Sequence, residues 1–190
     1  MYTGSDIGGF GSDTTEDLLM RWIEFGMFTP LMRNHAAIGT REQELYKFSH
    51  IDDFRNLIRL RYRMAPYLYS EFMKCVLENE MYFKPLAFEF PEDYRCQLMT
   101  KGHHYVPVAL NEVVIFVRKD HMLPLACMDE KLVTMHDIDF DNVEWLGYVE
   151  NQVTYTYYKD DGMTKQYTRK EDWDIVEKTK EMFEGYYISK

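Results

Sequence analysis

The chain has 190 residues and a formal net charge of −10, with 22 basic and 32 acidic side chains. A hydrophobic share of 46% argues against disorder, and no apolar run approaches the roughly 20 residues of a membrane-spanning helix. We therefore expect no membrane association. The acidic balance also disfavours nucleic acid as a partner, because its phosphates would be repelled, and a neutral or cationic ligand suits this composition better.

The cysteines are three in number, widely spaced and without a CxxC pair: Cys75, Cys96 and Cys127. This pattern is typical of reduced structural thiols, and it disfavours a disulfide framework or a zinc site. Met1 is followed at once by polar, glycine-rich sequence, which predicts no signal peptide. We expect a cytoplasmic protein that needs no metal and no cofactor.

The chain opens on a glycine-rich stretch, "YTGSDIGGFG" at residues 2–11, which contains the carboxylate Asp6. Its glycines suit a turn with unusual φ and ψ angles. A nucleotide loop is disfavoured, because the G-x-G-x-x-G spacing and the P-loop lysine are missing and Asp6 would repel phosphate. In a turn at the end of a buried strand, Asp6 is placed to accept hydrogen bonds from ligand hydroxyls. The alternative is an aspartate that bonds its own backbone.

"SDTTEDLLMRWIEFGMF", at residues 12–28, predicts a helix that ends at Gly26. The capping candidates are Ser12, Asp13 and Thr14, and the predicted apolar side consists of Leu18, Leu19, Trp22, Ile23 and Phe25. "MFTPLMRNHA" then predicts a short buried strand that runs into a polar loop. Taken alone, His35 in this loop could donate a hydrogen bond to a ligand, act as a general base or form only structural hydrogen bonds with its neighbours. Loop, helix, strand and loop together predict an α/β unit.

Residues 36–50 are polar and irregular. From Ile51 the apolar spacing predicts a long helix that is kinked at Pro66, where the backbone N–H is missing, and that ends near Asn79. "MYFKPLAFEFPED", at residues 81–93, predicts a strand bounded by prolines.

After about residue 100 the sequence takes on a β character. Tyr105–Leu110 and Val113–Val117 are β-type runs, and residues 151–170 predict a strand, an Asp161-Gly162 turn and a second strand. The last segment, at residues 171–190, is compatible with a strand or with a short helix. These signals predict an antiparallel β-module.

Several of these stretches resemble family-31 glycoside hydrolases, the α-glucosidase and α-xylosidase group. "GSDIGGFG", "TTEDLLMRWIEFGMFTPLMRNHA" and "TREQELYKF" resemble the late part of the catalytic barrel, and "LRYRMAPYLYSEF" resembles the helix that closes it. "ALNEVVIFVRKDHMLPLA" and "VTYTYYKDDGMTKQY" resemble the two β-domains that follow. The resemblance implies a C-terminal fragment of a bacterial-type α-glucosidase.

The fold that the resemblance implies is α/β and then all-β. The last β/α elements of a (β/α)8 TIM barrel are followed by truncated antiparallel β-sandwich domains. The implied boundaries are residues 1–80 for the barrel part, 81–126 for the proximal β-sandwich and 127–190 for the distal β-domain. Strand-forming sequence of the family looks absent near residues 96–102.

The resemblance also implies a substrate-binding role for four residues, with an α-glucoside oligosaccharide as the ligand. The aspartate of the family's glycine-rich loop falls on Asp6, and the phenylalanine that lines the sugar subsite falls on Phe10. The histidine that bonds a glucose hydroxyl falls on His35, and Arg33 with Asn34 supports the same corner. Carboxylate and imidazole groups suit sugar hydroxyls, and an aromatic ring suits the apolar face of a sugar.

The family's two catalytic aspartates lie upstream of the glycine-rich loop, and neither of their segments occurs in this sequence. A retaining glycosidase needs two carboxylates about 5 to 5.5 Å apart, so no catalytic residue is expected in this chain, and the chain alone is expected to be inactive or nearly so. The partners expected for such a piece are the N-terminal part of the barrel or a second copy of itself. Two alternatives stay open: a noncatalytic carbohydrate-binding or interaction module, and a complementing half of a split enzyme.

Overall fold

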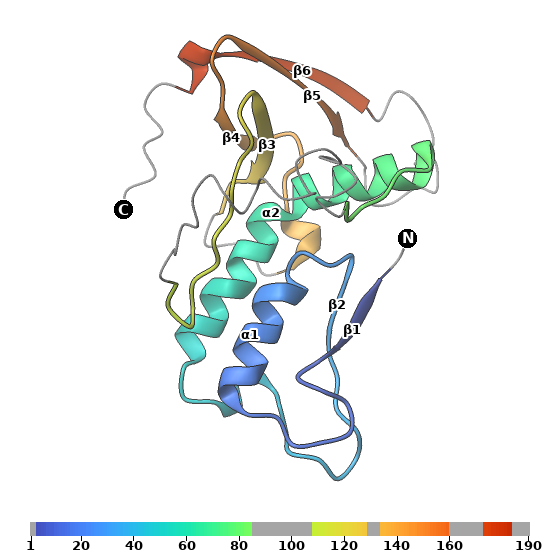
Figure 1. Ribbon diagram of the computed structural model, residues 1–190, viewed down its shortest axis with the longest axis vertical. Coiled ribbons are helices and arrows are strands. Elements are labelled where there is room, and N and C mark those ends of the chain that lie inside the picture. Colours follow the sequence, from blue (N-terminus) through green and yellow to red (C-terminus); the bar gives the residue numbers. More distant parts are fainter. Residues whose placement is uncertain (1–2, 85–107, 129–133, 160–172, 184–190) are drawn as a thin grey trace, which may run out of the picture.

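The computed structural model describes residues 3–84, 108–128, 134–159 and 173–183. An α/β part made from the N-terminal residues occupies one end, and two antiparallel strand pairs occupy the other (Figure 1). The long helix α2 (Ile51–Glu78) connects the two ends. Within these residues no helix is long and apolar enough to cross a membrane.

The N-terminal part confirms the predicted α/β unit. Strands β1 (Gly4–Ile7) and β2 (Leu31–Asn34) pair in parallel, and helix α1 (Glu16–Gly26) makes the crossover that parallel pairing requires. The structure differs from the prediction at Asp6, which lies in strand β1 and not in a glycine turn. The turn begins one residue after the strand, at Gly8, where φ is +91°.

Helix α1 is capped by Thr15, so the three predicted caps were wrong. The side-chain oxygen of Thr15 accepts a hydrogen bond from the backbone N–H of Leu18 at 3.2 Å. Asp13 instead accepts a hydrogen bond from the backbone N–H of Arg41 at 2.6 Å, which ties the start of the helix to a later loop. The helix ends at Gly26, as predicted. A Cβ at Gly26 would lie 2.6 Å from Cδ1 of Ile7, so this position needs a glycine for the close packing of α1 on β1.

The buried face of α1 differs in part from the predicted apolar side. Leu19 and Ile23 are buried as predicted, and so is Met20, which the prediction missed. Leu18 and Phe25 are 47% and 62% exposed. These two residues are seven positions apart and therefore share one helix face, and that face points away from the core.

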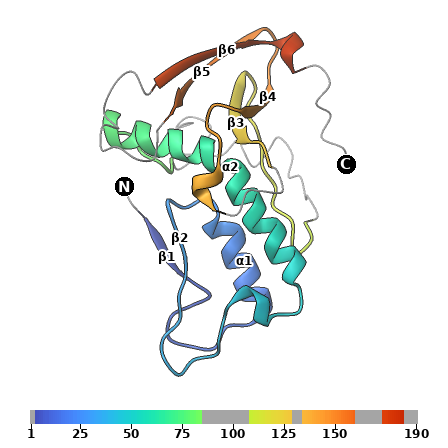
Figure 2. The ribbon, with the colours of Figure 1, turned by 180° about the vertical axis from the view of Figure 1, so that it is seen from behind.

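Helix α2 confirms the predicted limits of the long helix and the predicted kink at Pro66. Asn79 caps its C-terminal end in the left-handed conformation, and Pro66 lies inside it. The helix axis turns near its middle in both ribbon views (Figure 1 and Figure 2). Pro66 accounts for this bend, because it cannot donate the backbone hydrogen bond that a straight helix needs at that position.

Helix α2 contributes to the cores of both ends of the molecule. Near its start, Phe54 and Leu57 pack in one cluster with β1 and α1 side chains. Farther along, Met64 and Leu68 pack with Leu123 and Leu125 of strand β3 (His121–Ala126). The two ends are therefore held together through one continuous helix.

The β-module consists of two antiparallel pairs within the described residues. Strand β3 pairs with β4 (Val143–Tyr148), and β5 (Gln152–Tyr158) pairs with β6 (Trp173–Thr179). Strand β5 confirms the prediction for the start of the 151–170 segment. The last segment forms strand β6, and the short 3-10 helix Lys180–Met182 follows it.

Of the other predicted strands, some are absent from the structure and some fall on residues that the structure does not describe. Residues Val113–Val117 form no strand, although Val113 and Val117 pack against the core clusters, and residues 108–110 form none either. Strands β3 and β4 were missed. The Asp161-Gly162 turn, the strand expected after it, residues 85–93 and residues 105–107 lie outside the described residues, and residues 81–84 are irregular.

A polar cluster fastens β5 to α2. The hydroxyl of Tyr155 donates a hydrogen bond to Oε1 of Glu71 at 2.7 Å, and Nζ of Lys74 lies 2.7 Å from the same oxygen. The Lys74 ammonium also lies 3.9 Å from the centroid of the Tyr155 ring. Burial, followed by the charge of Glu71, raises the pKa of Tyr155. These contacts join helix α2 to the β-module through Tyr155.

Candidate functional site

The pairing of β1 with β2 places Asp6 beside Arg33. These residues are direct partners in the parallel register. Because side chains alternate between the two faces of a strand, Asp6 lies on the face opposite that of Ser5 and Ile7. Ile7 is buried in the cluster with α1, and Ser5 accepts a hydrogen bond from Nε1 of Trp22 at 3.0 Å. Asp6 and Arg33 therefore lie on the face of the sheet away from α1.

Asp6 is the centre of a three-residue polar cluster. Arg33 donates two hydrogen bonds to Oδ1 of Asp6, one from Nε at 3.0 Å and one from Nη2. Nδ1 of His35 lies 3.5 Å from the same oxygen. These partners lower the pKa of Asp6 below its usual value, the Arg33 hydrogen bonds most of all. Within the described residues Oδ2 of Asp6 has no hydrogen-bond partner, so this oxygen can accept a bond from a ligand.

Phe10 completes the cluster. Its ring centroid lies 5.2 Å from that of His35, at an interplanar angle of 53°, and its side chain is half exposed. The backbone N–H of Ala37 donates to the carbonyl of Phe10 at 2.8 Å, which holds the two loops together. All four residues predicted for the site, Asp6, Phe10, Arg33 and His35, thus lie close together.

A buried glutamine holds the two loops beneath this cluster. Nε2 of Gln43 donates hydrogen bonds to the carbonyl of Ile7 at 2.8 Å and to Oδ1 of Asn34 at 2.6 Å, and Nδ2 of Asn34 donates back to the Gln43 carbonyl at 2.7 Å. Asn34 is therefore a supporting residue. The sequence prediction missed Gln43, because a lone glutamine in an irregular stretch carries no recognisable signal.

Replacement of Gly8 by alanine is expected to lower the free energy of unfolding by about 1–3 kcal/mol, because its φ of +91° is unfavourable for other residues and an added Cβ would lie 2.8 Å from Oε1 of Gln43. Gly11→Ala is the matched control, since a Cβ there would meet nothing within 4 Å. Urea denaturation of both variants checks this. Equal losses would contradict the role given to Gly8.

Replacement of Arg33 by glutamine is expected to raise the pKa of Asp6 toward its usual value. In the wild type the lowered pKa means that the stabilising contribution of the pair is present above about pH 4 and is lost as the pH falls through the lowered value. Carboxyl-carbon NMR titration of Asp6 measures the shift. Arg55→Gln, which removes the partner of Asp52 on α2, serves as the control and leaves Asp6 unchanged.

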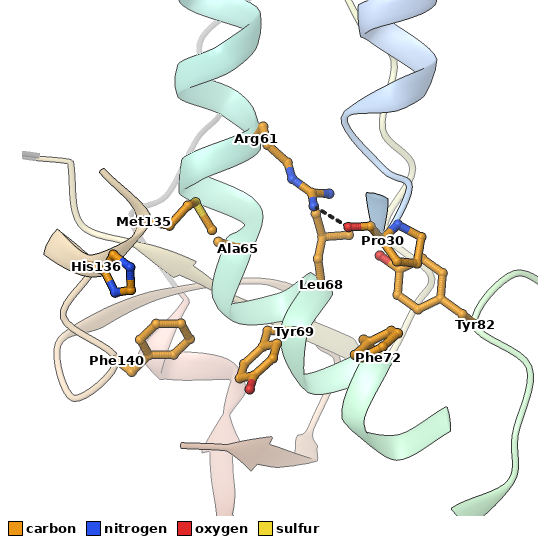
Figure 3. A pocket seen from close by; sticks show the side chains of 10 residues that line it. All are labelled: Pro30, Arg61, Ala65, Leu68, Tyr69, Phe72, Tyr82, Met135, His136 and Phe140. Atoms are coloured by element: carbon orange, nitrogen blue, oxygen red, sulfur yellow. Dashed lines mark hydrogen bonds between the residues drawn. The ribbon is translucent and has the colours of Figure 1, made fainter. Parts of the chain in front are cut away.

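A separate cavity of about 400 Å³ lies along α2 (Figure 3). Its lining is mostly apolar: Pro30, Arg61, Ala65, Leu68, Tyr69, Phe72, Tyr82, Met135, His136 and Phe140. Arg61 donates hydrogen bonds to the carbonyls of Met27 at 2.6 Å and Pro30 at 3.4 Å, so its charge caps the C-terminal end of α1. None of the four predicted site residues lines this cavity.

Metal binding has no visible basis in the part of the chain that the structure describes, where no group of three or more His, Cys, Asp or Glu side chains could hold an ion. The chemistry available around Asp6 is that of a fixed anionic acceptor beside donors and an aromatic ring. This combination suits a neutral polyhydroxylated ligand, because hydroxyls both donate and accept.

Comparison with known proteins places the N-terminal part of the chain in a family. Residues 1–71 match the family 31 TIM-barrel domain of the glycosyl hydrolases. The chain is 42% identical over 94 residues to alpha-glucosidase 2 of Bacillus thermoamyloliquefaciens and 44% identical over 92 residues to lysosomal alpha-glucosidase of Bos taurus. The matched part of the chain, residues 1–71, therefore belongs to the TIM-barrel domain of glycosyl hydrolase family 31. The two alignments cover 48% and 47% of this chain, but only 12% and 10% of those relatives.

Solved structures share the fold over most of the chain. The glucosidase II alpha subunit aligns with 92% of the chain at a TM-score of 0.73 and 19% identity, and the chain covers 24% of it. The family-31 dextranase of Flavobacterium johnsoniae, complexed with glucose, aligns with 90% at a TM-score of 0.67 and 23% identity, with 27% of it covered. The fold of this chain thus resembles part of much larger proteins.

Proposed function

We propose that this chain supplies the glucose-binding corner of a retaining α-glucosidase that removes terminal α-linked glucose from oligosaccharides. The single observation that carries the proposal is the cluster of Asp6, Arg33, His35 and Phe10. Asp6 and Arg33 lie on the face of the parallel strands away from α1, and Phe10 and His35 lie in the loops that follow these strands. Asp6 accepts from a sugar hydroxyl, His35 bonds a second, Phe10 covers an apolar face of the ring, and Arg33 keeps Asp6 ionised and in place.

The place of the cluster in the fold supports this assignment. Asp6 and Arg33 lie in the second half of their strands, and Phe10 and His35 follow directly in the loops. In TIM barrels, active sites are built from the loops at the C-terminal ends of the strands. The alpha-glucosidases that share more than 40% identity with half of this chain are consistent with a glucoside ligand.

The architecture that we propose is the end of a (β/α)8 barrel in residues 1–80, a truncated proximal β-sandwich in 81–126 and a distal β-domain in 127–190. The change from parallel to antiparallel pairing along the chain supports it. We propose no catalytic residue within the chain, because the sequence contains neither of the family's two aspartate segments. Without a nucleophile and an acid/base residue, hydrolysis by the chain alone is nil or very low.

Titration calorimetry with maltose tests the proposal. Saturable heat is expected for the wild type and is expected to be lost in His35→Ala, while His121→Ala, at the start of strand β3, binds as the wild type does. Heat that survives His35→Ala would favour the alternative of a carbohydrate-binding module in the β-part. Turnover of p-nitrophenyl α-glucoside by the chain alone would contradict the assignment of no catalytic residue.

A further inference from the structure

One buried side chain joins strands β1 and β2 at the point where their pairing ends. Gln43 belongs to the irregular segment after β2 and is only 5% exposed. Its Nε2 donates one hydrogen bond to the carbonyl of Ile7 at 2.8 Å and one to Oδ1 of Asn34 at 2.6 Å. Ile7 and Asn34 are the last residues of their strands and are partners in the register. The spacing of the two strand ends therefore depends on this one amide.

The two residues bonded by Gln43 are chain neighbours of two residues of the candidate sugar site. Ile7 directly follows Asp6, and Asn34 directly precedes His35. The contact between Oδ1 of Asp6 and Nδ1 of His35, at 3.5 Å, spans the same two strand ends. A change in the spacing of these ends would therefore change the distance between Asp6 and His35.

The orientation of the Gln43 amide is set by the two strand ends. Both hydrogens of Nε2 are used, one for each strand. The reverse orientation would place Oε1 against the carbonyl of Ile7, where two acceptors repel each other. In the observed orientation Oε1 is buried and has no hydrogen-bond partner within the described residues. The side-chain hydrogen bonds of Gln43 thus all go to Ile7 and Asn34.

We propose that Gln43 is a positioning residue for sugar binding, which fixes the distance between Asp6 and His35 by joining the ends of β1 and β2. The proposal rests on the proposed function, in which Asp6 and His35 bond two hydroxyls of one glucose. Gln43 is too deeply buried to contact the ligand, so it acts through these two residues. A ligand held at two points binds well only when both points keep their geometry, and supporting residues set that geometry.

Gln43→Met in the full chain tests the proposal, because methionine has a similar length but donates no hydrogen bond. Carboxyl-carbon NMR titration without sugar is expected to show the pKa of Asp6 raised toward its usual value, since Arg33 and His35 then move away from its Oδ1. The affinity for maltose, measured by titration calorimetry, is expected to fall by about tenfold, as for the loss of a supporting hydrogen bond.

Thr29→Val is the matched control for a merely structural effect. Thr29 is also 5% exposed, and its hydroxyl lies 2.7 Å from the carbonyl of Gly26 and 2.8 Å from that of Leu31, at the start of β2. The variant removes buried hydrogen bonds at the other end of the same strand. It is expected to lower the urea midpoint, while the pKa of Asp6 and the affinity for maltose stay those of the wild type.

Asn34→Ala provides the same two measurements if Gln43→Met does not fold, because Asn34 is exposed and only one of the two strand contacts is lost. Smaller changes in the same direction are expected. An unchanged pKa of Asp6, an unchanged affinity for maltose, or equal changes in Thr29→Val would each overturn the inference. Absence of maltose binding in the wild type would overturn the proposed function instead, since the titration of Asp6 is made without sugar.

Discussion

Replacement of Asp6 by asparagine is expected to weaken maltose binding by about 10- to 100-fold, because a hydrogen bond to a charged group contributes about 1.5–3 kcal/mol. The amide keeps the shape of the side chain but removes the negative charge that Arg33 and His35 surround. Titration calorimetry of the variant measures the loss, and circular dichroism verifies that the fold is kept.

The matched control for this variant is Asp52→Asn. Asp52 is also an ion-paired aspartate, but it lies on the first turn of α2 and its side chain is 80% exposed. Its replacement leaves the affinity for maltose unchanged. Equal affinity of Asp6→Asn and the wild type would remove Asp6 from the binding site and leave it as the structural partner of Arg33.

Replacement of Phe54 by alanine is expected to lower the free energy of unfolding by about 3–5 kcal/mol, through lost burial and the cavity left behind. Phe54 is fully buried where α1, β1 and α2 meet, and its ring lies 5.9 Å from that of Phe48. A loss of this size shows in urea denaturation as a much lower midpoint or as the loss of a cooperative transition.

Phe25→Ala is the control, because this residue lies on α1 of the same α/β part and is 62% exposed. Its replacement is expected to change stability by no more than about 0.5 kcal/mol. A Phe25→Ala variant as unstable as Phe54→Ala would mean that the exposed face of α1 is covered in solution, and it would contradict the core described for this chain.

The helices of the fold followed from local signals. The end of α1 at Gly26 and the left-handed cap of α2 at Asn79 both fall on residue types that commonly end helices, so both could be predicted. Burial on α1 was harder to predict. Met20 and Phe25 are both apolar residues of this helix, and only its contacts with β1 and α2 decide that Met20 is buried and Phe25 is exposed.

In the β-module, by contrast, local sequence signals predicted several strands wrongly. Residues Val113–Val117 have strong β-propensity, yet they form no strand, and Val113 and Val117 pack as irregular backbone against the core clusters. Strand β3 contains Pro124, which argues against a central strand, and within the described residues β3 pairs with β4 alone, so that the proline lies on an edge strand. In both segments the neighbouring elements, and not the local propensity, decide whether a strand forms.

The site residues were predicted by their resemblance to family-31 motifs, and their geometry was not. Nothing in the spacing of Asp6 and Arg33 reveals that they are register partners, since that depends on how β1 pairs with β2. The role of Gln43 could not be predicted for the same reason, because this side chain donates hydrogen bonds to Ile7 and Asn34 at the ends of the two strands. A motif indicates which residues to compare with the family, whereas the register of β1 and β2 is known only from the structure.

A maltose titration of the chain, followed by backbone amide chemical shifts, tests whether the cluster around Asp6 binds sugar. Saturable changes are expected at residues 6–10 and 33–37, which are the ends of strands β1 and β2 and the loops that follow them. Asp6→Asn is expected to shift the saturation to a higher maltose concentration. Changes centred on strand β5, or none at millimolar maltose, would contradict the claim that this chain carries the glucose-binding corner.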